Sequence, residues 1–462
     1  MIIVQITELK VMDQVKNYFL KTLLIGLLSL LLGCMAIYLS SPVNYTENNV
    51  LLVIVLSFIG IAVLAILLLL KWEYLLFIFA LSIGFQVYDP SPFELMFFIL
   101  VLLSLVRQIP LNKNMFINIL FFMLIVFLVF GTFAVIMSMN IYKAAVWHLI
   151  TVYLAICALF LASIIKNDKQ LFFFLKGYVF GAVANSFLGL ITYLAGKSQG
   201  RGNRLEGFFQ DPNIFSPYII IAILLVIEDL FSPKLFKSKT FKFLSILLMI
   251  SAVVLAMSRA GWINLAIALL LYFAIKVMKR QLKLGFVLKT ILIPISLLLS
   301  IYFLSPVLSD KVVGQLKERT TLQSYDNERF GAQFFTLDIV KNNAFGIGPG
   351  EITTIYYMDP HNTYLRVFAE YGWVSGILLL LLFLVITGVL LKKSVFHHKS
   401  EFNIYLVLLC ALAGTLVNII VVDALHWRHF WVLFALCYYV IIFKKDHAAD
   451  IKEKSYEKIN GK

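Results

Sequence analysis

Residues 359–391 read DPHNTYLRVFAEYGWVSGILLLLLFLVITGVLL, a polar loop that runs into an apolar stretch long enough to cross a membrane. Pro360 favours an extended conformation for the residue before it, and Asn362 or Thr363 is suited to cap a short helix over 364–370. His361 then lies just ahead of a helix N-terminus, clear of the helical hydrogen bonds. The stretch therefore predicts a membrane helix preceded by a polar loop in which an imidazole is free to act. The alternative is a polar histidine at the membrane interface, beside an aromatic anchor.

The composition supports a polytopic membrane protein. Of the 462 residues, 61% are apolar, 15% aromatic and 14% charged, whereas about a quarter of the residues in an average soluble domain are charged. The four cysteines lie inside apolar runs without paired spacing, which indicates packing residues and neither disulfides nor a zinc site. An apolar run follows Lys21 without a small-residue cleavage pattern, so we expect the first span to be retained.

Apolar runs predict about fourteen spans, which makes this an all-α polytopic membrane protein. They cover about 19–39, 50–70, 73–88, 93–107, 115–137, 143–165, 171–195, 214–231, 241–257, 261–278, 286–304, 371–391, 403–423 and 428–443. The runs at 73–88 and 93–107 are short, and a single re-entrant hairpin is the alternative for this pair. An even number of spans puts both termini on the same side.

The distribution of basic residues orients the chain. With both termini in the cytoplasm, most of the 39 Lys and Arg residues fall in inner segments, and the short outer loops hold few. The net charge of +14 then reflects topology and not a nucleic-acid partner. We expect a multi-pass membrane protein with both termini in the cytoplasm.

This topology divides the chain into four parts. Residues 1–304 form a bundle of eleven spans, 305–370 a long outer segment between spans 11 and 12, 371–443 the last three spans, and 444–462 a cytoplasmic tail. Apolar residues at helical spacing predict a helix over 329–340, so the outer segment is a folded, mostly helical cap. The glycines at 346–350 predict a turn. They do not form a nucleotide loop, because no strand precedes them and no Lys-Ser/Thr follows.

Three arginines at the predicted outer boundary are candidate ligands for a lipid diphosphate. Arg204 and Arg259 lie in two outer loops, and Arg329 begins the predicted helix of the outer segment. The loop with Arg204 runs into the span at 214–231, and Asn213 is placed to cap the N-terminus of that span. A guanidinium binds phosphate oxygens in bidentate fashion and stays charged at any working pH. The alternative is that these arginines reach to lipid headgroups.

A second polar group lies at the turn between the last two spans. Asp423, His426 and His429 have side chains that can bind metals, but their spacing straddles a turn and a fourth ligand is missing. We therefore predict no metal site and a polar turn that faces the outer side.

The ordered motifs resemble those of the O-antigen ligase and polymerase superfamily. They are Arg204-Leu-Glu-Gly-Phe-Phe-Gln-Asp-Pro-Asn213, Ser258-Arg259, Arg329 with the turn at 345–350, and His361-Asn-Thr-Tyr-Leu365 with Glu370-Tyr-Gly372. The resemblance implies a metal-independent glycosyltransferase of the bacterial plasma membrane. It would need no cofactor and would use an undecaprenyl-diphosphate-linked glycan as donor. Arginines that match Arg204 and Arg259 would bind the diphosphate, with Arg329 as a third member of the set. His361 would activate the acceptor hydroxyl, supported by Gln210, Asp211, Asn213 and Asn362.

The leading functional prediction is a polysaccharide polymerase that joins lipid-linked repeat units at the outer face of the plasma membrane. The nearest alternative is a ligase that transfers glycan to lipid A core, protein or a wall acceptor. A lipid-glycan flippase is a third alternative, but charged residues at mid-membrane are expected there. The expected partners are the glycan donor, a glycan acceptor and membrane lipid, with chain-length regulators or flippases as further protein partners.

Overall fold

The computed structural model describes residues 60, 63, 66–86, 90–197, 204–282, 324–398 and 401–443. These residues form helices and no strand, as an all-α fold requires. The helices are α3 (Trp72–Ser82), α4 (Pro92–Val106), η1 (Lys113–Phe116), α5 (Ile119–Ile136), α6 (Ile141–Ile164), α7 (Asp168–Leu194), α8 (Pro212–Phe231), α9 (Lys239–Leu255), α10 (Arg259–Met278), α13 (Ser324–Asn342), α14 (Ile352–Ile355), α15 (Thr363–Glu370), α16 (Gly372–Phe396), α17 (Ile404–Asn418) and α18 (Arg428–Ile442).

Six of these helices, α5, α6, α7, α8, α10 and α16, are long and apolar enough to cross a membrane. Shorter apolar helices are α3, α4, α17 and α18. The predicted spans 19–39 and 286–304, most of 50–70 and the tail lie outside the described residues, so the count of fourteen stays a prediction. Since α3 and α4 have 11 and 15 residues, against about 20 for a full span, the hairpin alternative also stays open.

Polar caps fix where many helices begin. The side chain of Asn118 accepts a hydrogen bond from the backbone N–H of Phe121 (2.9 Å), and that of Asn167 accepts one from Gln170 (3.0 Å). Each cap binds an N–H group that the helix itself leaves without a partner. The polar residues between apolar runs therefore define helix ends as well as loops.

Helix α8 lies at the centre of the bundle and packs against α7, α9, α10 and α17. Its side chains are buried almost along its whole length, which is typical of a helix that is apolar on all sides. Helices α8 and α10 approach closely at Gly261, where an added Cβ would lie 2.6 Å from the Cβ of Ser216. This contact brings the beginnings of α8 and α10 together.

At its opposite end, α8 is joined to α9 and to α10 by buried ion pairs. Lys242 lies 2.9 Å from Asp229, and Lys276 lies 2.7 Å from Glu228. All four side chains are at most 3% exposed. Lys279 donates hydrogen bonds to backbone carbonyls at the end of α16. Basic side chains thus gather at one end of the bundle, where the charge distribution of the sequence predicts the cytoplasm.

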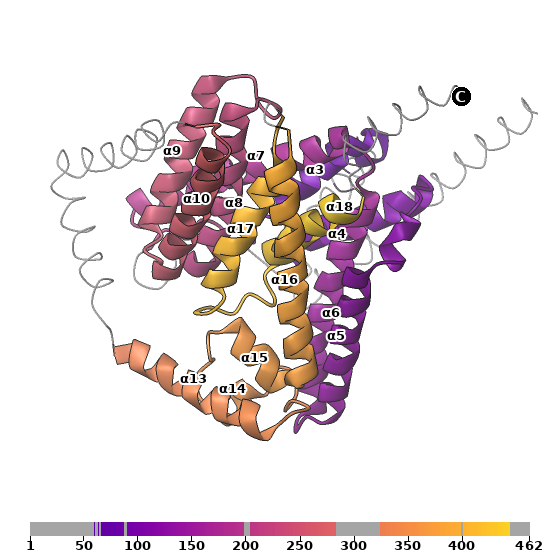
Figure 1. Cartoon of the computed structure of the whole chain (residues 1–462), viewed down its shortest axis with the longest axis vertical. Coiled ribbons are helices and arrows are strands. Elements are labelled where there is room, and N and C mark those ends of the chain that lie inside the picture. Colours follow the sequence, from indigo (N-terminus) through magenta and orange to yellow (C-terminus); the bar gives the residue numbers. More distant parts are fainter. Residues whose placement is uncertain are drawn as a thin grey trace, which may run out of the picture.

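Helices α13, α14 and α15 form a group beneath the bundle, which we call the helical cap (residues 324–370; orange in Figure 1). It has a small apolar core of its own, made by Ile339, Ile352 and Ala369. The helices predicted over 329–340 and 364–370 lie within α13 and α15, so both are confirmed. Gly372, whose φ of +85° a side chain would strain, ends α15 and starts α16.

Candidate active site

His361 lies where the sequence predicts it, one residue before the cap of α15. The side chain of Asn362 accepts a hydrogen bond from the N–H of Leu365 (3.0 Å), which identifies Asn362 and not Thr363 as the N-cap. His361 is half-buried and has a φ of +44°. This left-handed conformation is uncommon for a residue with a side chain and persists only where neighbouring contacts hold it.

The beginning of α15 is fastened to the loop between α17 and α18. The N–H of Thr363 donates to the carbonyl of Ile419 (2.9 Å), and its hydroxyl donates to that of Val422 (3.0 Å). The same hydroxyl accepts from the N–H of Ala424 (3.0 Å). Thr363 is therefore a joint between two loops that lie about sixty residues apart in the sequence.

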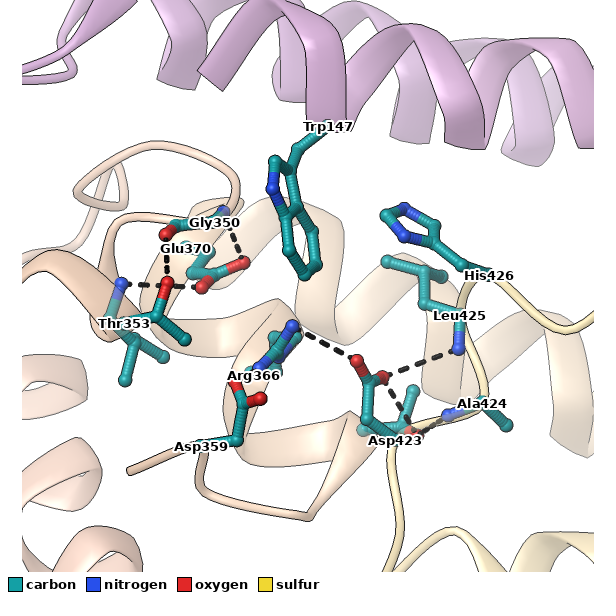
Figure 2. A network of polar contacts seen from close by, with 12 residues as sticks. Trp147, Gly350, Thr353, Asp359, Arg366, Glu370, Asp423, Ala424, Leu425 and His426 are labelled. Atoms are coloured by element: carbon teal, nitrogen blue, oxygen red, sulfur yellow. Dashed lines mark hydrogen bonds and ion pairs between the residues drawn. The ribbon is translucent and has the colours of Figure 1, made fainter. Parts of the chain in front are cut away.

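Arg366 makes a second joint between these loops. It forms ion pairs with Asp359, which precedes His361 by two residues, and with Asp423 at 3.0 Å. Its guanidinium also lies over the ring of Trp147, 5.1 Å from the centroid. Figure 2 shows Arg366 between the two carboxylates, with Trp147 approaching from α6. Burial acts to lower the pKa of Arg366, but the carboxylates of Asp423 and Glu370 outweigh it and raise that pKa.

Glu370 fastens the other end of α15 to the glycine-rich turn. Its carboxylate accepts hydrogen bonds from the N–H groups of Gly350 (2.8 Å) and Ile352 (3.4 Å). Burial raises the pKa of Glu370 to about 7, against the opposing effect of Arg366. A Cβ at Gly346 would lie 2.5 Å from the carbonyl of Glu370, so this part of the turn has to be glycine. The turn predicted at 346–350 is confirmed, and its role is to dock against α15.

The two motifs that carry Arg204 and Arg259 are joined to each other. The N–H of Leu205 donates to the carbonyl of Leu255 (3.2 Å), and Nε of Arg204 donates to that of Ala256 (2.9 Å). The hydroxyl of Ser258 donates to the side-chain oxygen of Asn213 (2.8 Å). The loop before α8 and the turn before α10 therefore form one structure, in which Arg204 is 9% exposed.

The structure corrects the role expected for Asn213. The cap of α8 is Asp211, whose side chain accepts from the N–H of Asn213 (2.8 Å), with Pro212 as the first helical residue. Pro212 lacks an N–H and is well suited to that position, and the side chain of Asn213 instead binds Ser258. Gln210, before the cap, is exposed and has a φ of +59°.

Arg259 connects this structure to the helical cap. Its Nη2 lies 2.6 Å from the carboxylate of Asp326 on α13. Arg259 remains 35% exposed, whereas Asp326 is 8% exposed. Arg329 lies one turn further along α13 and is half-buried. Because α13 also packs against α15, α13 links the arginine loops to the helix that His361 precedes.

The three residues considered as metal ligands engage different partners. Asp423 binds Arg366, and Nε2 of His426 lies 3.1 Å from the hydroxyl of Thr151. Burial lowers the pKa of His426. His429 is buried in α18, in ring contact with Phe209. In the parts of the chain that the structure describes, no group of three His, Cys, Asp or Glu side chains is placed to hold a metal ion.

No motif in the sequence gives a role to Arg366 or Trp147. One signal was present, since Arg366 and Glu370 are four residues apart and share a helix face. Their partners were not predictable, because Trp147 is on α6 and Asp423 is in the loop between α17 and α18, both far from α15 in the sequence. The structure thus contains a buried charged cluster beside the His361 loop that local spacing does not reveal.

Part of the chain is similar to a known protein family. Residues 244–381 match the family model described as O-Antigen ligase. The matched residues run from α9 into α16 and contain Arg259, Arg329 and His361, whereas Arg204 and its motif lie before them. No curated protein matches the chain. The family match confirms the superfamily that the motifs of the sequence resemble.

Proposed function

Because residues 244–381 belong to the O-antigen ligase family, we propose that the protein is a glycosyltransferase acting on lipid-linked glycans. The proposed reaction is polymerisation of undecaprenyl-diphosphate-linked repeat units at the outer face of the plasma membrane. The observation that carries the proposal is the pairing of Arg259 with Asp326. This ion pair connects a guanidinium beside the Arg204 loop to the helical cap, which also contains His361.

In this reaction an acceptor hydroxyl attacks the anomeric carbon of the donor sugar. The new bond joins the hydroxyl oxygen to that carbon, the bond from the carbon to the phosphate oxygen breaks, and lipid diphosphate leaves. His361 takes the hydroxyl proton, because imidazole titrates near neutral pH and suits a general base. The imidazole precedes the N-terminus of α15, so it does not compete for the hydrogen bonds of that helix.

The departing diphosphate gains negative charge as the bond breaks. Arg204 and Arg259 neutralise this charge, and Arg329 on α13 contributes a further guanidinium. Fixed cations at the position where charge develops stabilise a transition state without needing to reorganise. The backbone contact of Arg204 and the ion pair of Arg259 restrict both side chains before substrate arrives. The donor carries its own leaving group, so the proposal needs no nucleotide and no metal.

Transfer of a finished glycan to lipid A core, protein or a wall acceptor uses the same donor chemistry. The two activities differ in the glycans that accumulate when the gene is deleted. We expect single lipid-linked repeat units, measured by mass spectrometry of extracted lipids. Accumulation of long lipid-linked chains would identify a ligase, and an unchanged lipid fraction would refute both activities.

The base is tested in the same deletion strain by expressing His361→Gln and His361→Ala. We expect turnover to fall about a hundred- to ten-thousand-fold, with unchanged membrane insertion. His398→Gln is the matched control, because His398 is exposed at the far end of α16. Wild-type polymer from His361→Gln would show that this imidazole takes no proton.

A further inference from the structure

We propose that Arg366 is a positioning residue, which holds His361 in its reactive orientation by clamping the loop before α15 to the loop between α17 and α18. This inference rests on the proposed function, since it gives His361 the role of base. Arg366 itself does not touch substrate in this account. It acts through the backbone on either side of His361.

The position of the two carboxylates supports the clamp. Asp359 lies two residues before His361, and Asp423 lies in the loop between α17 and α18. Arg366 comes from the first turns of α15, so one guanidinium connects three segments of the chain. A planar guanidinium can bind two carboxylates at once, whereas an ammonium acts as a single point charge.

The conformation of His361 explains why a clamp is needed. Its φ of +44° lies in the left-handed region, which a residue with a Cβ leaves unless its neighbours are fixed. On the C-terminal side, Asn362 caps α15 and Thr363 binds Ile419. On the N-terminal side, the ion pair between Asp359 and Arg366 performs the equivalent function. With both flanks held, the direction of the imidazole is fixed.

The surroundings of Arg366 argue against a direct role in binding donor. Its side chain is 1% exposed, and two carboxylates and the face of Trp147 occupy its surroundings (Figure 2). A diphosphate would have to displace these carboxylates from a buried position. Arg259, by contrast, is about one third exposed. Arg366 should therefore affect the rate of the chemical step and leave donor binding unchanged.

The first experiment compares Arg366→Gln and Arg366→Lys with wild type in purified enzyme supplied with lipid-linked repeat units. We expect kcat to fall about a hundred-fold, as a displaced catalytic group predicts, with the KM for donor changed less than twofold. Arg107→Gln is the control, because Arg107 is a half-buried arginine whose guanidinium also has hydrogen-bond partners within the protein. Arg107 lies at the C-terminal end of α4 and donates to the backbone carbonyls of residues 67, 68 and 70, which precede α3.

The second experiment separates positioning from general support of the fold. In a His361→Gln background, Arg366→Gln should leave the residual rate unchanged, because a residue that acts through His361 has no effect without it. Hydrogen exchange should increase at the amides of Thr363 and Leu365 and stay unchanged in α13. Where Arg366→Gln does not fold, Arg366→Lys takes its place in both experiments.

The outcomes distinguish this inference from the proposed function. If His361→Gln is inactive but both Arg366 variants keep wild-type kcat, the clamp is wrong and the base assignment stands. A raised KM at unchanged kcat would make Arg366 a donor-binding residue and also refute the clamp. If His361→Gln retains full activity, the proposed base fails whatever the Arg366 variants do.

Discussion

Replacing Glu370 with Gln should change how the stability of the protein depends on pH. The carboxyl of Glu370 is fully buried, and burial raises its pKa from the ordinary value of 4.5 to about 7. Between these two values the folded protein keeps a proton that the unfolded chain has lost. The contribution of this group to the free energy of unfolding is therefore fully present below about pH 4.5. It falls as the pH rises from there to about 7, and at higher pH it no longer changes.

The size of the effect follows from the two pKa values. At about 1.36 kcal/mol for each pH unit, the interval from 4.5 to about 7 corresponds to about 3 kcal/mol. With an unfolding entropy of about 2.1 cal/mol/K for each residue, this equals a change of about 3 °C in Tm for 462 residues. Glutamine keeps an oxygen for the N–H of Gly350 but cannot ionise.

The assay is thermal unfolding in detergent, followed by tryptophan fluorescence at pH 5 and pH 8. The Tm of Glu370→Gln relative to wild type should rise by about 3 °C between the two pH values. Glu328→Gln on α13 is the control, since changes at an exposed side chain usually alter stability by less than about 0.5 kcal/mol. If the Tm difference between Glu370→Gln and wild type is the same at both pH values, Glu370 does not titrate in this range and the reasoning is wrong.

Three further predictions test the site and the topology. Arg204→Lys and Arg259→Lys should each lose most activity while expression is unchanged, because lysine cannot make the bidentate phosphate contact. Arg428→Lys is the control. Normal turnover in both variants would mean that the two arginines bind lipid headgroups. Activity should survive thorough chelation, because arginines neutralise the diphosphate; loss that one divalent metal restores would overturn the arginine assignment. Single cysteines at Lys197 and Lys341 should react with an impermeant thiol reagent in intact cells, whereas cysteines at Lys237 and Lys392 should not. The reverse labelling pattern would place the site in the cytoplasm and refute the proposed reaction.

Several features of the fold follow from local sequence. The apolar runs predict α5 to α10 and α16 to α18 closely, because a membrane span must bury its own backbone hydrogen bonds in a helix. The short helix over 364–370 was also predictable from local sequence, because Asn362 lies next to its start and can cap it. The same signal placed His361 just ahead of this helix, and His361 lies within the residues that match the family model.

The contacts that build the site were decided only by the tertiary structure. Asn213 was expected to cap α8, but Asp211 takes that position because Pro212 follows it, and Asn213 binds Ser258 instead. Arg259 and Asp326 are separated by the whole segment from α10 to α13, and no local pattern pairs them.

The same holds for the cluster around Arg366. A sequence gives the spacing of residues along one helix, so Arg366 and Glu370 are recognisable as neighbours. The partners Trp147 and Asp423 come from α6 and from the loop before α18. Those elements meet α15 only when the bundle packs and the helical cap folds against it. Local propensity and patterning therefore determined the helices and the position of His361 in its loop, whereas long-range packing decided which charges surround that loop, because burial and pairing depend on elements distant in the chain.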